Sequence, residues 1–211
     1  MSELFVLTER PSVYLASRSP RREELLRQLG VEFQPLLVRE AAGRRRDIVE
    51  APRKDEAPPD YVKRMARTKA TVGWHRMGRR SLPPKPVLGA DTEVVLDGAP
   101  IGKPADAAGA AAMIASLSGK AHEVVTAVAL RWQSELVMAV SHSRVSFRAI
   151  AKDEIERYVA TGEPLDKAGG YAIQGRAAAF VRRLEGSYSG VMGLPLFETA
   201  ELLARIGFPV I

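Results

Sequence analysis

The chain has no cysteine and only three histidines, His75, His122 and His142. The missing thiols exclude disulfide bonds, a thiolate nucleophile and cysteine-ligated metal sites, and they fit a reducing cytoplasm. The histidines do not have the spacing of zinc ligands.

Long apolar runs are also missing. None approaches the ~18 residues that a membrane span needs, and the first ten residues, with Glu3, Glu9 and Arg10, lack a signal-peptide pattern. At 211 residues, 46% of them hydrophobic, the chain can form one large core or two closely joined lobes. We therefore expect a cytoplasmic globular protein with no membrane segment, in which residues 1–12 are a short N-terminal extension.

Negative charge is in the minority, because 31 Lys and Arg face 25 Asp and Glu, for a net charge of +6. Much of the excess falls in two loop-like stretches, residues 44–46 with Arg53 and Lys54, and residues 79–80 with Lys85. Neither has interleaved aromatic residues for base stacking. The charge admits nucleotides or other anions as partners, although solvated loop charge is the simpler interpretation.

Common nucleotide and hydrolase motifs are absent. There is no Gly-x-x-x-x-Gly-Lys-Ser/Thr phosphate loop, no Gly-x-Gly-x-x-Gly after a strand and no Gly-x-Ser-x-Gly nucleophile elbow. If the protein handles nucleotides, it does so with another architecture.

The strongest local pattern is a strand that turns into a helix. Residues 13–16 form an apolar run, Ser19 is a good N-cap, Pro20 takes the first helical position and the helix should end at Gly30. Two arginines at 21–22 then lie at a helix N-terminus, whose free N–H groups attract anions such as phosphate. An ordinary capped surface helix with solvated arginines explains this pattern, taken alone, slightly better than an anion site does.

Further elements alternate along the chain. The periodicity and turn signals predict strands at 32–38, 87–96, 122–132, 136–147 and 180–184, helices that begin at Asp60, Asp106 and Asp153 and one at 197–206, loops at 39–59 and 78–86, and a glycine-rich stretch at 166–175. Because strands and helices are mixed in order, we predict an α/β fold in which a mixed sheet has helices on both faces.

A carboxylate and two lysines are candidates for chemistry. Asp91 follows an apolar strand segment, which suits a metal ligand or general base as well as a cap of the local turn. Lys103 follows 12 residues later between Gly102 and Pro104, in a rigid loop that could point back toward Asp91. Solvent exposure is the default for Lys103 and for Lys69.

The glycine-rich stretch holds two more candidates. Lys167 adjoins Asp166, and a structural ion pair is the simplest interpretation there. Gln174 could read the edge of a base, since an amide supplies both a donor and an acceptor, or it could be an ordinary loop residue.

In combination, these motifs resemble the Maf family of nucleoside triphosphate pyrophosphatases. The matching segments occur in the family's order: LASRSPRR (15–22), KA (69–70), GADT (89–92), GKP (102–104), LSG (117–119), DKAG (166–169), IQG (173–175) and GLP (193–195). The resemblance covers about residues 13–206, and it implies a single Maf-like domain over 1–211.

The resemblance implies an inosine-triphosphatase-like fold, with an elongated mixed β-sheet flanked by helices and two lobes around a central cleft. It implies hydrolysis of a nucleoside triphosphate between the α and β phosphates, which yields the monophosphate and pyrophosphate. A divalent metal cation, Mg²⁺ or Mn²⁺, and a homodimer are expected with it.

The resemblance also assigns residues. Asp91 falls on the proton acceptor, and Arg21, Thr92 and Gln174 fall on positions linked to substrate choice. These three match the branch resembling dTTP/UTP pyrophosphatases, whereas the branch resembling 7-methyl-GTP pyrophosphatases carries Trp, Gln and Glu there. Residues expected to bind phosphate are Ser17, Arg22, Lys69, Lys103 and Lys167, while Arg18 is expected in solvent.

The metal ligands are less clearly marked. Members of the family carry an acidic pair just after the second strand, where this chain has Glu40 followed by a basic run. We therefore expect Asp91 and Glu40 to bind the metal, with Asp47 or Glu50 in place of Glu40 if the loop is longer.

Other functions stay open at this stage. The same fold could act on 7-methyl-GTP-type substrates or on modified pyrimidine nucleotides. A non-catalytic nucleic-acid-binding or cell-division regulatory protein would fit the basic charge, but it would not need Asp91, Lys69 and Lys103 together. Nucleic acid binding is therefore not expected.

Overall fold

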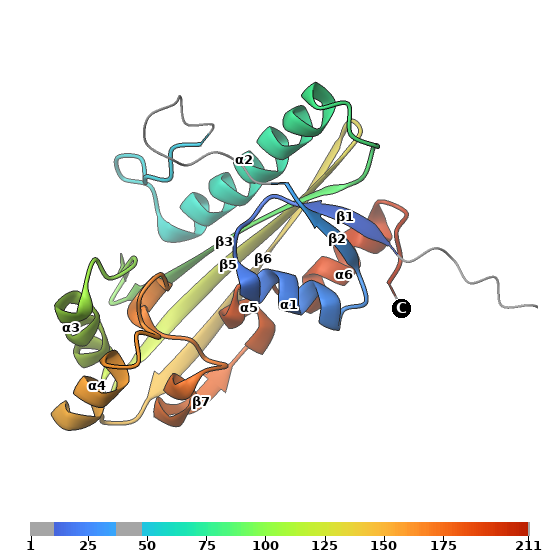
Figure 1. Ribbon diagram of the computed structural model, residues 1–211. Coiled ribbons are helices and arrows are strands. Elements are labelled where there is room, and N and C mark those ends of the chain that lie inside the picture. Colours follow the sequence, from blue (N-terminus) through green and yellow to red (C-terminus); the bar gives the residue numbers. More distant parts are fainter. Residues whose placement is uncertain (1–10, 37–47, 211) are drawn as a thin grey trace, which may run out of the picture.

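The computed structural model describes residues 11–36 and 48–210, and these form one seven-stranded sheet with helices on both faces (Figure 1). The strand order is β2-β1-β3-β5-β6-β7, and β4 pairs with β3. The pairings of β1 with β2 and β3 are parallel and the other pairings are antiparallel, which confirms the predicted mixed sheet. The strands are β1 (Ser12–Leu15), β2 (Glu32–Pro35), β3 (Val87–Leu96), β4 (Ala99–Pro100), β5 (Ala121–Trp132), β6 (Glu135–Phe147) and β7 (Val181–Glu185).

Six α-helices and two short 3₁₀ turns complete the described chain. α2 lies along one face of the long strands, α1, α5 and α6 lie on the other face, and α3 and α4 pack together at the far end (Figure 1). The bounds are α1 (Pro20–Gln28), α2 (Pro58–Arg79), α3 (Ala107–Leu117), α4 (Lys152–Val159), α5 (Tyr188–Met192), α6 (Leu196–Arg205), η1 (Ala168–Gly170) and η2 (Arg176–Phe180).

The alternation of side chains along β5 divides the core into two layers. Successive residues of a strand point to opposite faces, so odd and even positions pack against different helices. Odd positions of β5 meet one side of α2, in a layer of Val62, Ala66, Ala70, Val125, Ala127 and Ala129. Even positions, among them Val124, Val128 and Leu130, join the larger core on the other face.

α2 approaches β3 unusually closely at Gly89. A Cβ at that position would lie 2.5 Å from the Ala66 carbonyl oxygen and 2.6 Å from the Ala70 nitrogen, closer than real Cβ contacts allow. The missing side chain therefore lets the helix backbone rest on the strand. This approach brings Lys69 of α2 against the segment of β3 that carries Asp91.

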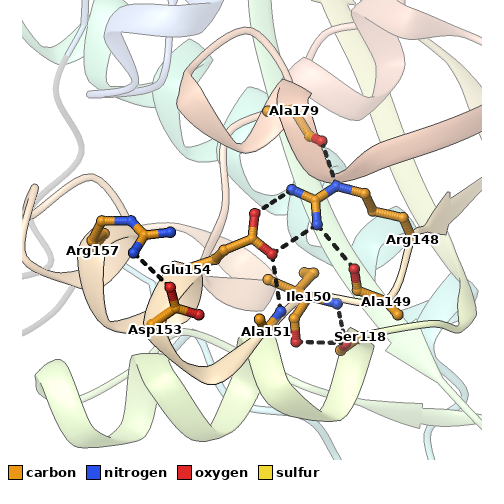
Figure 2. A network of polar contacts seen from close by, with 9 residues as sticks. All are labelled: Ser118, Arg148, Ala149, Ile150, Ala151, Asp153, Glu154, Arg157 and Ala179. Carbon is orange, nitrogen blue, oxygen red and sulfur yellow. Dashed lines mark hydrogen bonds and ion pairs between the residues drawn. The ribbon is translucent and has the colours of Figure 1, made fainter.

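A polar network fixes the far end of the molecule (Figure 2). The Arg148 guanidinium donates to both carboxylate oxygens of Glu154, at 2.9 and 2.7 Å, and Glu154 also accepts the Ala151 N–H at the start of α4. The Ser118 hydroxyl at the end of α3 accepts the Ile150 N–H at 2.8 Å. The hydrogen bond from Arg148 lowers the pKa of Glu154 to about 2. The network thus joins the ends of α3 and β6 to α4, which leads into the glycine-rich stretch.

The predicted start of α2 is wrong by a few residues. α2 begins at Pro58 rather than after Asp60, because proline is favoured at the first helical position, where its missing N–H costs nothing. Asp60 lies in the first turn and pairs with Lys63. Ser19 does occupy the predicted N-cap of α1, but its side chain makes no capping hydrogen bond.

Other boundaries also differ from the predictions. α2 continues to Arg79, into the predicted 78–86 loop, and α4 begins at Lys152, one residue before Asp153. β7 begins at Val181, because Phe180 still belongs to η2. The sequence did not predict α5, whose N-terminus is capped by the Ser187 hydroxyl. β2 ends at Pro35, and residues 37–38 of the predicted strand lie outside the described residues.

Within the described ranges, no helix combines the length and the apolar character that crossing a membrane would require.

Candidate active site

The site lies where one edge of β3 is left open. β1 and β4 pair with the same edge of β3 but do not meet. The Ala16 N–H donates to the Leu88 carbonyl at one end of the gap (2.8 Å), and the Ile101 N–H donates to the Val94 carbonyl at the other (2.9 Å). Residues 89–93 form the edge between them. A cavity of about 390 Å³ opens at this edge.

The cavity collects side chains from segments that are far apart in sequence. The start of α1, α2, β3, the loop after β4, the glycine-rich stretch and the end of α5 all contribute. Five cationic and three acidic side chains line it, so its charge is positive overall; they are Arg21, Arg22, Lys69, Lys103, Lys167, Glu50, Asp91 and Glu93. Thr92 and Gln174 also line it. Of the predicted site residues, Ser17 does not line the cavity and Glu40 lies outside the described residues.

Asp91 is held by a lysine on the neighbouring helix. Lys69 Nζ lies 2.8 Å from Asp91 Oδ1 and 2.5 Å from Glu50 Oε1, and the Lys69 side chain is only 10% exposed. Burial opposes ionisation of Glu50, but the charge and hydrogen bond of Lys69 outweigh it and lower the pKa of Glu50. The ammonium therefore fixes one oxygen of Asp91 and has a third N–H that could reach a phosphate oxygen.

Glu93 shares a strand face with Asp91, since the two are separated by one residue. Its Oε1 accepts the Gly102 N–H at 3.2 Å, and the Gly102 carbonyl accepts the Gly169 N–H at 2.7 Å. Burial, together with the charge of Asp91, raises the pKa of Glu93. These bonds tie β3 to the loop that carries Lys103 and to the glycine-rich stretch.

Arg22 is buried and joins three segments. Its Nε donates to the Gly193 carbonyl at 2.8 Å, Nη1 to Ser17 Oγ at 3.1 Å and Nη2 to Thr92 Oγ1 at 3.3 Å. Desolvation by burial lowers the pKa of Arg22. Ser17 thus lies behind Arg22 and orients it. Among the described residues, two of the five guanidinium N–H groups have no partner and are available for an anion in the cavity.

The hydroxyl of Thr92 is already engaged by the protein. Thr126 Oγ1 lies 2.9 Å from Thr92 Oγ1 and 2.7 Å from the Gly190 carbonyl oxygen. A hydroxyl has one hydrogen and a carbonyl can only accept, so Thr126 donates to Gly190 and Thr92 donates to Thr126. Thr92 therefore contributes to the site first by holding Arg22, and its contact with a substrate base stays a prediction.

The glycine-rich stretch brings the last two predicted residues to the cavity. Lys167 Nζ lies 2.9 Å from Asp166 Oδ1, so the ion pair between these neighbours is present. Lys167 also lines the cavity. Gln174 is half-buried, and its Oε1 is a buried acceptor with no hydrogen-bond partner in the described part of the chain. A buried acceptor without a donor costs about 1–3 kcal/mol. Because Gln174 lines the cavity, a turn of its side chain could offer this acceptor to a donor of a ligand there.

The carboxylates fit a hard divalent cation that is shared with a ligand. Over residues 11–36 and 48–210, no group of three or more His, Cys, Asp or Glu could hold a metal ion alone. Mg²⁺ is commonly bound by one or two carboxylates together with substrate phosphates. Asp91 and Glu93 supply such oxygens, Glu50 is paired with Lys69, and Asp47, like Glu40, lies outside the described residues.

Glu93, Tyr61 and Gly193 are among the lining residues that were not predicted as site residues. Glu93 could have been found from its position two residues after Asp91, on the same strand face. From the sequence, Tyr61 was predicted only to lie on the apolar face of a helix. In the structure it lines the cavity at the start of α2. Gly193 was named only as part of the GLP motif, with no role assigned. In the structure its carbonyl accepts a hydrogen bond from Arg22.

Known proteins are similar to this chain in sequence over nearly its whole length. The family model described as Maf-like protein matches residues 12–206. A protein of Nitrosomonas europaea named dTTP/UTP pyrophosphatase is 52% identical over 198 residues, 94% of this chain and 96% of its own length. Proteins of the same name from Aromatoleum aromaticum and Cupriavidus metallidurans are 55% and 56% identical, over 94% and 92% of this chain and 97% and 96% of their own lengths. The resemblance drawn from the motifs is confirmed over nearly the whole chain.

Proposed function

This chain belongs to the Maf family, and on that basis we propose that it hydrolyses dTTP and UTP to the monophosphate and pyrophosphate. The observation that carries the base preference is the unpartnered Oε1 of Gln174, a residue that lines the same cavity as the pair formed by Asp91 and Lys69.

Gln174 suits uracil and thymine. Both bases present an N3–H donor between two carbonyl oxygens. The oxygen of an amide side chain can accept from N3–H, and its NH₂ group can donate to one of the carbonyl oxygens. Cytosine has an unprotonated N3 and so offers no donor at that place. A site in which Gln174 accepts from N3–H therefore favours UTP over CTP, because binding cytosine would leave that acceptor unpaired.

The cationic side of the cavity suits the phosphates. A nucleoside triphosphate carries about four negative charges at neutral pH. Arg21, Arg22, Lys69, Lys103 and Lys167 converge on one cavity, in which a triphosphate would offset their mutual repulsion. Cations placed near the β and γ phosphates also stabilise the charge that pyrophosphate gains as it leaves.

Asp91 is the proton acceptor in this proposal. Lys69 holds Oδ1, which leaves the other oxygen to orient a water and take its proton. The water oxygen bonds to the α-phosphorus, the bond from that phosphorus to the bridging oxygen breaks, and pyrophosphate leaves with the bonding electrons. Mg²⁺ or Mn²⁺ on Asp91, with Glu93 or Glu40, would neutralise phosphate charge when bound.

Pyrophosphate release across a panel of triphosphates tests the proposal. With Mg²⁺ or Mn²⁺ present, we expect kcat/KM for dTTP and UTP to exceed that for 7-methyl-GTP by at least ~100-fold, about 3 kcal/mol of discrimination. CTP and GTP complete the panel, together with modified pyrimidine nucleotides. A faster reaction with 7-methyl-GTP would overturn the assignment, and undiminished activity with a chelator present would overturn the metal requirement.

The remaining expectations from the family resemblance also belong to the proposal. We expect a homodimer, to be measured by light scattering at micromolar concentration. We expect the protein to act in the cytoplasm, where triphosphates are made and used. No observation on the described residues favours a non-catalytic role over hydrolysis.

A further inference from the structure

Glu163 lies outside the cavity but binds the segment that follows Gln174. Its Oε2 accepts the Arg176 N–H at 3.0 Å, and its Oε1 accepts the Ala177 N–H at 3.4 Å. These N–H groups belong to the first turn of η2, which begins directly after Gly175. The carboxylate therefore caps this turn at the point where the chain leaves the cavity.

The same carboxylate is held on its other side by a buried tyrosine. The Tyr158 hydroxyl donates to Glu163 Oε1 at 3.0 Å, and only 4% of Tyr158 is exposed. Burial, together with the charge of Glu163, raises the pKa of Tyr158, so the hydroxyl remains a donor at neutral pH. Because Tyr158 lies on α4, Glu163 is fixed to the helix at the far end of the molecule.

Gly175 makes this contact possible. A Cβ at position 175 would overlap the carboxylate of Glu163. The chain is thus pressed against Glu163 at the residue that follows Gln174, and the Gly175 N–H also donates to the Ala172 carbonyl at 3.0 Å. The backbone position of Gln174, and with it the reach of its amide, is set from this side of the loop.

We propose that Glu163 is a positioning residue that fixes the placement of Gln174 and thereby sets the preference of the site for uracil and thymine. The proposal rests on the pyrimidine triphosphate function given above. Glu163 does not touch the substrate. It acts by holding η2 and with it the backbone of Gln174, a residue that lines the cavity and whose Oε1 has no hydrogen-bond partner among the described residues.

The ratio of UTP to CTP hydrolysis is the most selective measure of this role. Uracil and cytosine have the same shape and carry the same sugar and triphosphate, and they differ in hydrogen bonding at N3 and C4. A general loss of folding or of phosphate binding lowers both rates alike. A displaced Gln174 lowers the preference itself, because a preference of this kind depends on the placement of one hydrogen-bonding group.

The test uses Glu163→Gln with Glu154→Gln as its matched control. Glu154 is also a carboxylate that caps a helical turn and binds several donors in the same part of the molecule (Figure 2). It does not line the cavity. In Glu163→Gln the side-chain amide presents N–H groups to N–H donors. We expect the ratio of kcat/KM for UTP over CTP to fall about 10-fold, through a higher KM for UTP. Glu154→Gln should keep the wild-type ratio.

A second variant and a second measurement guard against failure to fold. Gly175→Ala forces the carboxylate away while it leaves Glu163 in place, and it should lower the same ratio. Amide hydrogen exchange followed by mass spectrometry reports the contact without any substrate. Exchange in 174–178 should be faster in Glu163→Gln than in wild type and Glu154→Gln. An unchanged ratio in folded Glu163→Gln and Gly175→Ala would overturn the proposal.

These measurements separate this proposal from the proposed function. If the wild-type protein releases no pyrophosphate from UTP, the function is wrong, whatever the exchange data show. If it prefers UTP over CTP and Glu163→Gln keeps that preference, the function stands and the role of Glu163 is wrong.

Discussion

At the scale of single residues, the site depends on pairs in which one side chain fixes another. Lys69 holds Asp91, Glu93 holds the N–H of Gly102, and Thr92 holds Arg22. In each pair the charge or donor that faces the cavity has its position set by the protein before any ligand arrives. Such preorganisation is the main source of electrostatic catalysis.

The first prediction at this scale concerns Asp91. Asp91→Asn keeps the shape and removes the proton acceptor, so kcat for UTP should fall about 1000-fold, within the range of general-base catalysis. Asp97→Asn is the control, because Asp97 is an exposed turn residue that pairs only with Lys120 over 3.5 Å in the described contacts. Full activity of Asp91→Asn with normal metal dependence would remove Asp91 from the mechanism.

The second prediction concerns His122, which is 2% exposed and lies 2.8 Å from the Tyr171 hydroxyl. Desolvation by burial lowers the pKa of His122 from 6.5 to about 4. Between these values the unfolded chain binds more protons than the folded chain, so stability is complete above pH 6.5 and falls as the pH drops toward 4.

Urea unfolding of wild type and His122→Gln measures this effect. The wild-type free energy of unfolding should fall by about 3 kcal/mol more than that of the variant between pH 6.5 and 4. Carboxylates with lowered pKa, such as Glu154, contribute equally in both proteins and cancel in the comparison. Parallel curves for the two proteins would show that His122 is not buried in its neutral form.

At the scale of elements, the contact between α2 and β3 is central, because it places Lys69 against Asp91. Gly89→Ala should destabilise the protein by about 2 kcal/mol or more, since the added methyl group meets backbone atoms that cannot move independently. Gly78→Ala is the control, because Gly78 lies on α2 and a Cβ there would meet nothing within 4 Å. It should be neutral or stabilising by about 0.5 kcal/mol.

Thermal unfolding together with UTP hydrolysis checks this prediction. Gly89→Ala should lower the melting temperature and also reduce kcat, whereas Gly78→Ala should change neither by much. A Gly89→Ala protein with wild-type stability would mean that α2 does not lie as close to β3 as described.

The long elements were predictable from sequence, because their signals are local. The alternation along β5 and β6 and the Asp106 cap of α3 are confirmed, the latter by a 2.7 Å bond from the Gly109 N–H. The start of α2 was missed because Asp60 looks like a cap, whereas Pro58 had the stronger preference for the first position. The short helix α5 was missed because five residues carry no periodic pattern.

The site could be predicted only in part for a similar reason. Motifs identified most of the charged residues that face the cavity, but they missed Glu93 and the contacts between distant segments. The bond from Arg22 to Gly193 joins residues 171 positions apart, and no local pattern indicates it. The pairing of Glu50 with Lys69 likewise depends on the path of the segment before α2, which brings Glu50 next to a lysine on that helix. No sequence pattern indicated a role for Glu163, because that role depends on its contacts with η2 and Gly175.

At the scale of the whole molecule, the cavity exists because the two neighbours of one edge of β3 stop short of each other. β1 leaves β3 to enter α1, β4 joins it later, and the open edge between them is surrounded by segments from both ends of the chain (Figure 1). Helices from both faces of the sheet, α2 on one and α1 and α5 on the other, thus contribute side chains to one cationic cavity. The same arrangement places Asp91 within reach of phosphate groups and Gln174 within reach of a base.

The most direct test of the account follows the oxygen of the attacking water. UTP is hydrolysed by the wild-type protein in ¹⁸O-labelled water with Mg²⁺, and the products are analysed by mass spectrometry. Attack at the α-phosphorus predicts one ¹⁸O atom in UMP and none in pyrophosphate. Label in pyrophosphate, or release of inorganic phosphate in its place, would contradict the account.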